Sequence, residues 1–297
     1  MSDNKAIIPI YLNAPMANNL FTIVVQEFAQ SKSILNKNQT VINIKTPLSE
    51  FSYDLFGKFI QGDVTIQHLN EFSKQRNEAL ISKDIFIFYN LRKILIENKI
   101  LKVIDNDFDT STLKENDFIV FNSKIYNNPI FSYFQRIINV LEMQTVFENN
   151  SPNKRSDDLN VSYSDQKTSI LKKLKTDIES IKSCSCQKYI SKNIKNTGMN
   201  AVIPLVSSNI IENQDYLTLG NINVIGKVTN LINEENADGI DLLSGSYFDY
   251  IDSDYFINFK KNYLNDSPLI EDFDTEMLKS KPPTMEILPI ALYIWYN

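Results

Sequence analysis

The sequence predicts an α+β fold, in which amphipathic helices pack on a mixed, largely antiparallel sheet. Two observations predict it. Short runs rich in Ile, Leu and aromatic residues, typical of strands, lie at residues 7–13, 200–208 and 285–297. Other segments place apolar residues three and four positions apart, which is helical spacing. The opening and closing runs both hold a proline between large aliphatic residues, and we expect these N- and C-terminal strands to lie in the same sheet.

Each of the three strand-like runs carries a proline in its middle, at Pro9, Pro204 and Pro289. Proline has no backbone N–H and its ring fixes φ, so within sheets it occupies edge strands, first positions or bulges. We therefore expect each proline to lie at a bulge or at a position that needs no ladder hydrogen bond.

The first half of the chain alternates predicted helices and strands. A helix is expected after the first strand, because Asn13 can cap it and Pro15 suits its first turn. A later helix should begin at Pro129, which follows the capping residue Asn128. In chain order, the predicted elements are a helix at 13–32, a strand at 40–46, a helix at 83–98, strands at 100–104 and 117–126, and a helix from 129 onward.

A segment at 148–167 has almost no large aliphatic residues and many turn formers, which is typical of a linker. It predicts three parts: an N-terminal α+β region at 1–147, the linker itself, and a C-terminal helix plus β-rich region at 168–297. If the two terminal strands share a sheet, the linker divides the sequence without separating the structure.

The second half begins with a predicted helix over 168–198, which Gly198 should end. Its apolar seam consists of Leu171, Leu174, Ile178 and Ile181. Two strand-like runs, 221–232 and 238–248, are expected to form a hairpin. A short helix at 254–264 and the closing strand complete the predicted elements.

Composition places the chain among ordinary globular proteins. It has 297 residues, 43% hydrophobic content, 22% charged content and a formal net charge of -6, which suits a folded domain rather than a disordered one. No apolar run approaches the roughly 20 residues that span a bilayer, and no signal peptide is recognisable. We expect a cytoplasmic protein without a membrane partner. Its two cysteines, Cys184 and Cys186, are too few for a disulfide framework.

The sequence offers no catalytic, cofactor-binding or metal-binding constellation, and we predict none of the three. His68 is the single histidine and has no nucleophile beside it. Neither a P-loop nor a dinucleotide-binding glycine motif is present. One enzymatic alternative stays open, a metal-dependent hydrolase using the crowded carboxylates Asp249, Asp252 and Asp254.

A lysine-rich stretch at 167–195 is the strongest indication of a partner. If it is helical, its lysines could contact nucleic-acid phosphates or an acidic protein surface. Its apolar seam could equally pair with another helix as a short coiled coil, or simply pack it on the protein with its lysines in solvent. The candidate contact residues are Lys172, Lys173, Lys175, Lys182, Lys188 and Lys192.

Several segments together resemble one known family. They are IIPIYLN, LRKILIENKILKVI, DFIVFNSKIYNNPI with its following helix, VIGKVTNLI and ILPIALYI. In this order they are similar to a family of uncharacterised bacterial proteins, domain of unknown function sixty-four-fourteen. The resemblance implies no activity, cofactor or catalytic residue, and it suggests a link to phage defence or mobile elements.

We therefore expect a non-enzymatic interaction or regulatory component that acts through a protein partner or as a homo-oligomer. A nucleic-acid-binding protein that uses the lysine-rich stretch and the carboxylate hydrolase are the alternatives.

Overall fold

A computed structural model describes residues 6–23, 83–97, 99–150, 168–176, 178–179, 186–234, 236–245, 254, 257–258, 260–261 and 272–296. The strands of its main sheet are β1 (Ala6–Leu12), β2 (Leu101–Ile104), β3 (Phe118–Lys124), β4 (Cys186–Ser191), β5 (Asn200–Val206), β6 (Asn221–Ile232) and β9 (Thr284–Tyr296). Two short strands, β7 (Ile240–Asp241) and β8 (Lys279–Ser280), pair with each other. The labelled helices are α4 (Lys83–Glu97) and α5 (Pro129–Asn150). The predicted α+β class is confirmed.

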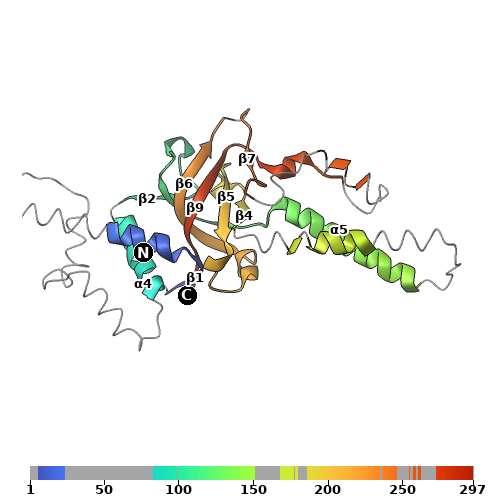
Figure 1. Cartoon of the computed structure of the whole chain (residues 1–297). Coiled ribbons are helices and arrows are strands. Elements are labelled where there is room, and N and C mark those ends of the chain that lie inside the picture. Colours follow the sequence, from blue (N-terminus) through green and yellow to red (C-terminus); the bar gives the residue numbers. More distant parts are fainter. Residues whose placement is uncertain are drawn as a thin grey trace, which may run out of the picture.

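The main sheet has the strand order β2-β3-β6-β9-β5-β4, and β1 pairs with β9 outside this path. The β2–β3 and β5–β9 pairs are parallel, whereas the other pairs are antiparallel. Ala6 lies opposite Tyr296 in the β1–β9 pair. The prediction that the N- and C-terminal strands share one sheet is therefore confirmed (Figure 1).

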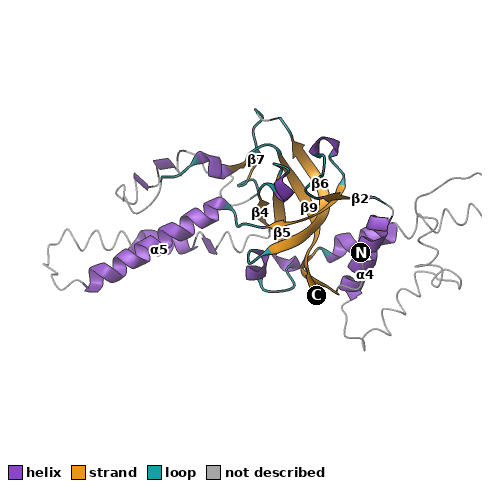
Figure 2. Cartoon of the chain, turned by 180° about the vertical axis from the view of Figure 1, so that it is seen from behind, coloured by secondary structure: helices purple, strands orange, loops and turns teal. Residues whose placement is uncertain are grey.

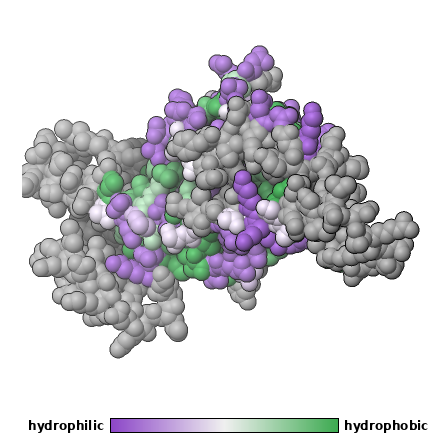
Figure 3. Space-filling view, turned by 45° about the vertical axis from the view of Figure 1, so that its right-hand side comes forward, coloured by the Kyte–Doolittle hydropathy of each residue, from purple (hydrophilic) through white to green (hydrophobic). Residues whose placement is uncertain are grey.

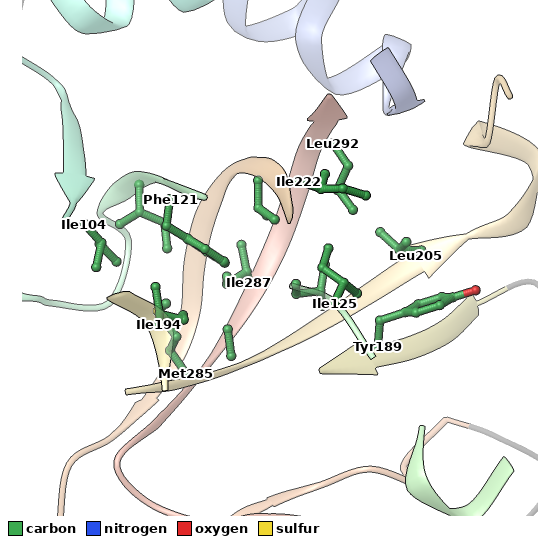
Figure 4. Close-up of a cluster of buried hydrophobic side chains, with 14 of the residues drawn as sticks. Ile104, Phe121, Ile125, Tyr189, Ile194, Leu205, Ile222, Met285, Ile287 and Leu292 are labelled. Carbon is green, nitrogen blue, oxygen red and sulfur yellow. The ribbon is translucent and has the colours of Figure 1, made fainter. Parts of the chain in front are cut away.

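The sheet curls until β4, at one end, meets the segment that follows β3. Beyond β3, the Tyr126 N–H donates to the Ile190 carbonyl at 2.8 Å, and the Ile190 N–H donates to the Tyr126 carbonyl at 2.9 Å. This reciprocal pair joins β3 to β4 and closes a small barrel of β3, β6, β9, β5 and β4. Figure 4 shows the buried side chains inside the curved sheet. Alternate strand residues supply this core, among them Ile119, Phe121, Ala201, Ile203, Ile222, Val224, Met285 and Ile287.

Two of the three strand prolines lie at bulges, as predicted. Pro9 precedes a register shift that leaves Ile10 as the extra residue of β1. Pro289 adjoins a second shift, where Ile290 is the extra residue between the pairs Ile225–Ala291 and Gly226–Pro289. In both cases the residue left outside the ladder follows the proline directly, so the regular pairing is interrupted next to the residue that lacks an N–H.

Pro204 satisfies the expectation in a different way. It lies opposite Lys188 in the β4–β5 pair, and the parallel β5–β9 pairing has already ended at Val202. Ile190 directs its N–H and carbonyl away from β5, toward Tyr126. Because these directions alternate along a strand, Lys188, two residues earlier, also directs both groups away from β5. No donor is needed from Pro204.

The outer face of the barrel is covered by α4 and by the helical residues 14–23 (Figure 1). Asn13 caps the first of these helices, because its Oδ1 accepts the Met16 N–H at 3.2 Å, which confirms the predicted cap. On α4, the Arg92 guanidinium lies over the Trp295 ring at 4.7 Å and its Nε donates to the Tyr293 hydroxyl at 2.9 Å. This contact fastens α4 to β9.

A helical arm projects from the barrel (Figures 1 and 2). It consists of α5 and the helical residues 168–176 and 178–179. As predicted, α5 begins at Pro129, and the Asn128 side chain accepts the Ile130 N–H at 3.1 Å. Leu174 and Ile178 of the predicted seam are buried against α5. The seam therefore packs within the chain, which is the plainest of the alternatives that the sequence left open.

The predicted helix over 168–198 is wrong in its second half. Residues 186–191 form β4, and a 3-10 helix, η3 (Ile194–Asn196), follows. In β4, Tyr189 is buried in the barrel core while Ile190 is buried in a separate cluster outside it. Such two-sided burial needs a strand, since successive strand residues point to opposite faces.

The predicted hairpin of 221–232 with 238–248 is also wrong. The neighbours of β6 are β3 and β9, and β7 pairs with β8 instead. The reason is the burial of β6, whose residues 222–226 are all buried and therefore suit a central strand.

Strands from both sides of the predicted linker share the barrel, since β3 pairs with β6. Residues 148–150 of the predicted linker belong to α5, so the linker prediction is wrong at its start. The predicted strand at 40–46, residues 151–167 of the linker, His68, Ile181, Cys184, Asp249 and Asp252 lie outside the described residues. Within the described residues, no helix combines the length and apolar character needed to span a bilayer.

Candidate functional site

Exposed apolar side chains do not by themselves mark a site. On the face shown in Figure 3, hydrophobic residues reach the surface in several places among hydrophilic ones. Across the described residues, Val103 and Leu219 are among the large hydrophobic side chains that are exposed. Scattered exposure of this kind is normal in folded proteins, so a functional site has to be sought where polar groups converge in a hollow.

Such a hollow lies beside β4. It has a volume of about 240 Å³ and is lined by residues 186–189 of β4, by the start of α5, by residues 242–245, and by η5 (Gln214–Leu217) with the following Thr218. The pocket therefore lies where the barrel meets the helical arm. Its lining includes residues from both faces of β4, because it opens at the edge of that strand.

Among the described residues, no strand pairs with this edge of β4, because β3 turns away. The closing pair between Tyr126 and Ile190 is followed by Asn128 and by Pro129, where α5 begins. The backbone N–H and carbonyl of Lys188 point to the same side of β4 as those of Ile190. No described residue hydrogen-bonds to them across this edge. One backbone donor and one acceptor of Lys188 thus point toward the pocket.

One wall of the pocket is a network of amide and phenol groups. Gln214 Nε2 donates to the Tyr189 hydroxyl at 2.5 Å and to Gln187 Oε1 at 2.9 Å. Burial raises the pKa of the Tyr189 phenol above its usual value, and the nearby negative charge of Asp215 raises it further, while the Gln214 hydrogen bond lowers it. The phenol is therefore neutral at physiological pH, and this wall offers uncharged donors and acceptors. Figure 4 shows Tyr189 at the side of the barrel core, with its hydroxyl directed away from it.

The second wall contains a cation that is already neutralised. Lys188 Nζ lies 3.2 Å from Glu286 Oε1, and its side chain is only 12% exposed. The same ammonium donates to the Asp241 carbonyl at 2.9 Å and to the Ser244 hydroxyl. Lys188 thus ties β4 to the segment after β7 and leaves little charge for a ligand.

The rest of the lining is apolar. It comes from Ile130 and Phe131 in the first turn of α5, and from Leu242 and Leu243 after β7. Asn128 Nδ2 donates to the Leu242 carbonyl at 3.0 Å, which fixes this segment against the start of α5. Apolar surface with a few placed polar groups is the usual composition of a binding pocket.

The structure does not bring the predicted lysines together on one helix. Lys172, Lys173 and Lys175 are exposed on the helical arm, where Lys175 pairs with Glu142 at 2.6 Å. Lys188 belongs to β4, and the exposed Lys192 follows that strand. Lys182 lies outside the described residues. Nucleic-acid binding by these lysines stays a prediction.

Sequence reasoning missed the amide and phenol wall of the pocket, whereas Lys188 of the other wall is one of the predicted contact residues. Gln187, Tyr189 and Gln214 belong to no motif, and glutamines carry no charge signal. The one available signal was the two-residue spacing of Gln187 and Tyr189, which places both side chains on one face of a strand. The helical interpretation of this stretch obscured it. Within the described part of the chain, no group of three or more His, Cys, Asp or Glu residues could hold a metal ion.

Comparison with known proteins identifies a family. The profile of the family described as domain of unknown function (DUF6414) matches residues 7–293. The chain belongs to the DUF6414 family. This confirms the resemblance seen in the short apolar segments. The match to DUF6414 covers the barrel, α4 and the helical arm, so the pocket lies inside the family domain. No curated protein and no solved structure matches this DUF6414 chain significantly.

Proposed function

We propose that this DUF6414 protein is an interaction component that binds a protein partner in the pocket beside β4. The observation that carries the proposal is the outward-facing backbone of Lys188, placed in a pocket whose amide and phenol groups are hydrogen-bonded to one another and whose lysine is paired with Glu286. A partner that enters would meet preformed donors and acceptors on a rigid barrel, so little ordering cost opposes binding.

The chemistry of the pocket supports binding more than catalysis. A general base or nucleophile needs a pKa near the working pH. Tyr189 has a pKa raised mainly by burial, and the Lys188 ammonium is held by Glu286 and by two further acceptors. Both groups are suited to hold a fixed hydrogen-bond pattern. On the family resemblance, we further propose a cytoplasmic bacterial setting and a link to phage defence or mobile elements.

Site-specific photo-cross-linking in the source cells tests this function. A photoreactive amino acid at Thr218, in the pocket lining, is compared with one at Glu115, an exposed loop residue before β3. We expect one partner protein to cross-link from position 218 and not from 115. Gln214→Ala should abolish that cross-link and weaken binding of the purified partner. Equal cross-linking from both positions, or full cross-linking in Gln214→Ala, would refute the proposal.

A further inference from the structure

We infer that the partner enters the pocket as an extended peptide segment, which adds a strand to the open edge of β4 and carries neutral amide or hydroxyl side chains. This inference rests on the proposed function and specifies the class of ligand. Three observations support it: the direction of the β4 backbone groups, the size of the pocket and the distribution of its charges.

The backbone of β4 is prepared for one further strand pair. Ile190 exchanges two hydrogen bonds with Tyr126 through its backbone N–H and carbonyl. Lys188, two residues earlier, presents its own N–H and carbonyl on the same side of β4. A peptide residue placed opposite Lys188 would form the same reciprocal pair. In an antiparallel arrangement it would continue the ladder that β3 begins and that the chain leaves at Pro129. Main-chain hydrogen bonds of this kind supply affinity in strand-addition complexes, while side-chain pockets supply specificity.

The pocket is too small for most cofactors. Its volume of about 240 Å³ lies below the roughly 300–1,000 Å³ of typical small-molecule sites. A segment of an extended chain fits this limit better, since it advances only about 3.4 Å per residue and places successive side chains on opposite faces. Two or so residues would lie in the pocket, with the rest of the peptide outside it.

The charged groups around the pocket favour some side chains of the bound peptide over others. The peptide residues that flank the central one would point to the same face as Gln187 and Tyr189, toward the amide and phenol network. Asp215 lies on this side and raises the pKa of Tyr189 electrostatically, while Lys188 is neutralised by Glu286. An acidic side chain would meet repulsion without a compensating cation, so Asn, Gln, Ser or Thr is favoured.

A second copy of the chain fits this edge poorly. Two β4 edges that paired around a two-fold axis centred on Lys188 would place the two Lys188 side chains directly opposite each other. Each Lys188 ammonium is already held by its own Glu286, so neither side chain would gain a partner from the other copy. The heterologous peptide is therefore the preferred occupant.

The experiment selects ligands from a phage-displayed library of random heptapeptides on the purified full-length protein. Peptides are kept if binding is lost in Gln214→Ala but retained in Gln144→Ala, a matched glutamine change farther along α5. Because Gln214 is exposed, the variant should fold, and its circular dichroism and melting temperature verify this. The strongest peptide is then resynthesised with a single N-methyl group at each position in turn.

We expect alternation in the N-methyl series. Methylation of the residue opposite Lys188 removes one strand hydrogen bond and should weaken binding about tenfold. Methylation of its immediate neighbours, whose N–H groups face away from β4, should have a much smaller effect. Replacing a flanking Asn or Gln by Asp should weaken binding more than replacing it by Ala.

The outcomes separate the two proposals. Pocket-dependent peptides without the alternating N-methyl effect would overturn strand addition and leave the proposed function intact. Strand addition would likewise be overturned, and the proposed function kept, if cross-linking from position 218 succeeds but the library yields no pocket-dependent peptide. Failure of both the cross-linking and the selection would overturn both proposals.

Discussion

Gly226 is predicted to be the least replaceable glycine of the barrel. It lies in β6 beside the bulge of β9, and a Cβ added there would lie 2.5 Å from Ile287 Cγ2 and 2.7 Å from the Leu288 carbonyl oxygen. The Ile287 side chain could rotate, but the carbonyl belongs to the backbone of the central strand. Gly226→Ala therefore requires β6 and β9 to separate locally.

The expected loss of stability is about 1–3 kcal/mol, the usual cost of overpacking a core. A gain of roughly 0.4–1 kcal/mol from the lower entropy of the unfolded chain offsets part of it. Gly220→Ala is the matched control, because a Cβ at Gly220 has no atom within 4 Å; it should be neutral or slightly stabilising. Urea unfolding can be followed by the fluorescence of Trp295, the single tryptophan, which lies on β9. Equal stability of the two variants would refute the proposed close packing of β6 and β9.

Three further predictions concern the pocket lysine, the buried Tyr189 and the arm. Lys188→Met should lower the free energy of unfolding by about 1–3 kcal/mol, since it leaves the Glu286 carboxylate without its ion pair; thermal melts should show partial recovery when Glu286→Gln is added. Burial raises the pKa of Tyr189, so its stabilising contribution is complete below the unfolded pKa of about 10 and is lost as pH rises through the higher folded value. Tyr189→Phe should therefore lose less stability between pH 8 and 11 than the parent, and equal slopes in urea midpoints would contradict this. On the arm, Leu174→Ala should cost about 2–5 kcal/mol, whereas Lys172→Ala, in solvent, should stay within about 0.5 kcal/mol; similar effects would show that the seam does not face α5.

The sequence predicted elements well where local chemistry decides the structure. The beginning of α5 followed from Asn128 and Pro129, because a cap and a first-turn proline act within one helical turn. The bulges at Pro9 and Pro289 followed from the missing N–H of proline. The shared sheet of the terminal strands followed from their similar pattern and was confirmed by the β1–β9 pair.

Prediction failed where the partner strand lies far away in the chain. Residues 186–191 have no strong strand signal of their own; β5 follows them closely, but the closing contact of Ile190 with Tyr126 comes from a distant segment. The pairing of β6 with β3 and β9, rather than with the next strand-like run, likewise depends on distant segments. The amide wall of the pocket could not be predicted either, because Gln187 and Gln214 come from separate segments, β4 and η5, that meet only in the folded chain.

The position of β9 in the sequence constrains how the barrel can be made. It is the last of the described strands, yet it lies between β6 and β5 and also carries β1. As the ribosome produces the chain, β3, β4, β5 and β6 all emerge before the strand that must lie among them. Barrel assembly should therefore wait until β9 has been translated, and the edges of β5 and β6 that pair with it stay exposed in the nascent chain until then.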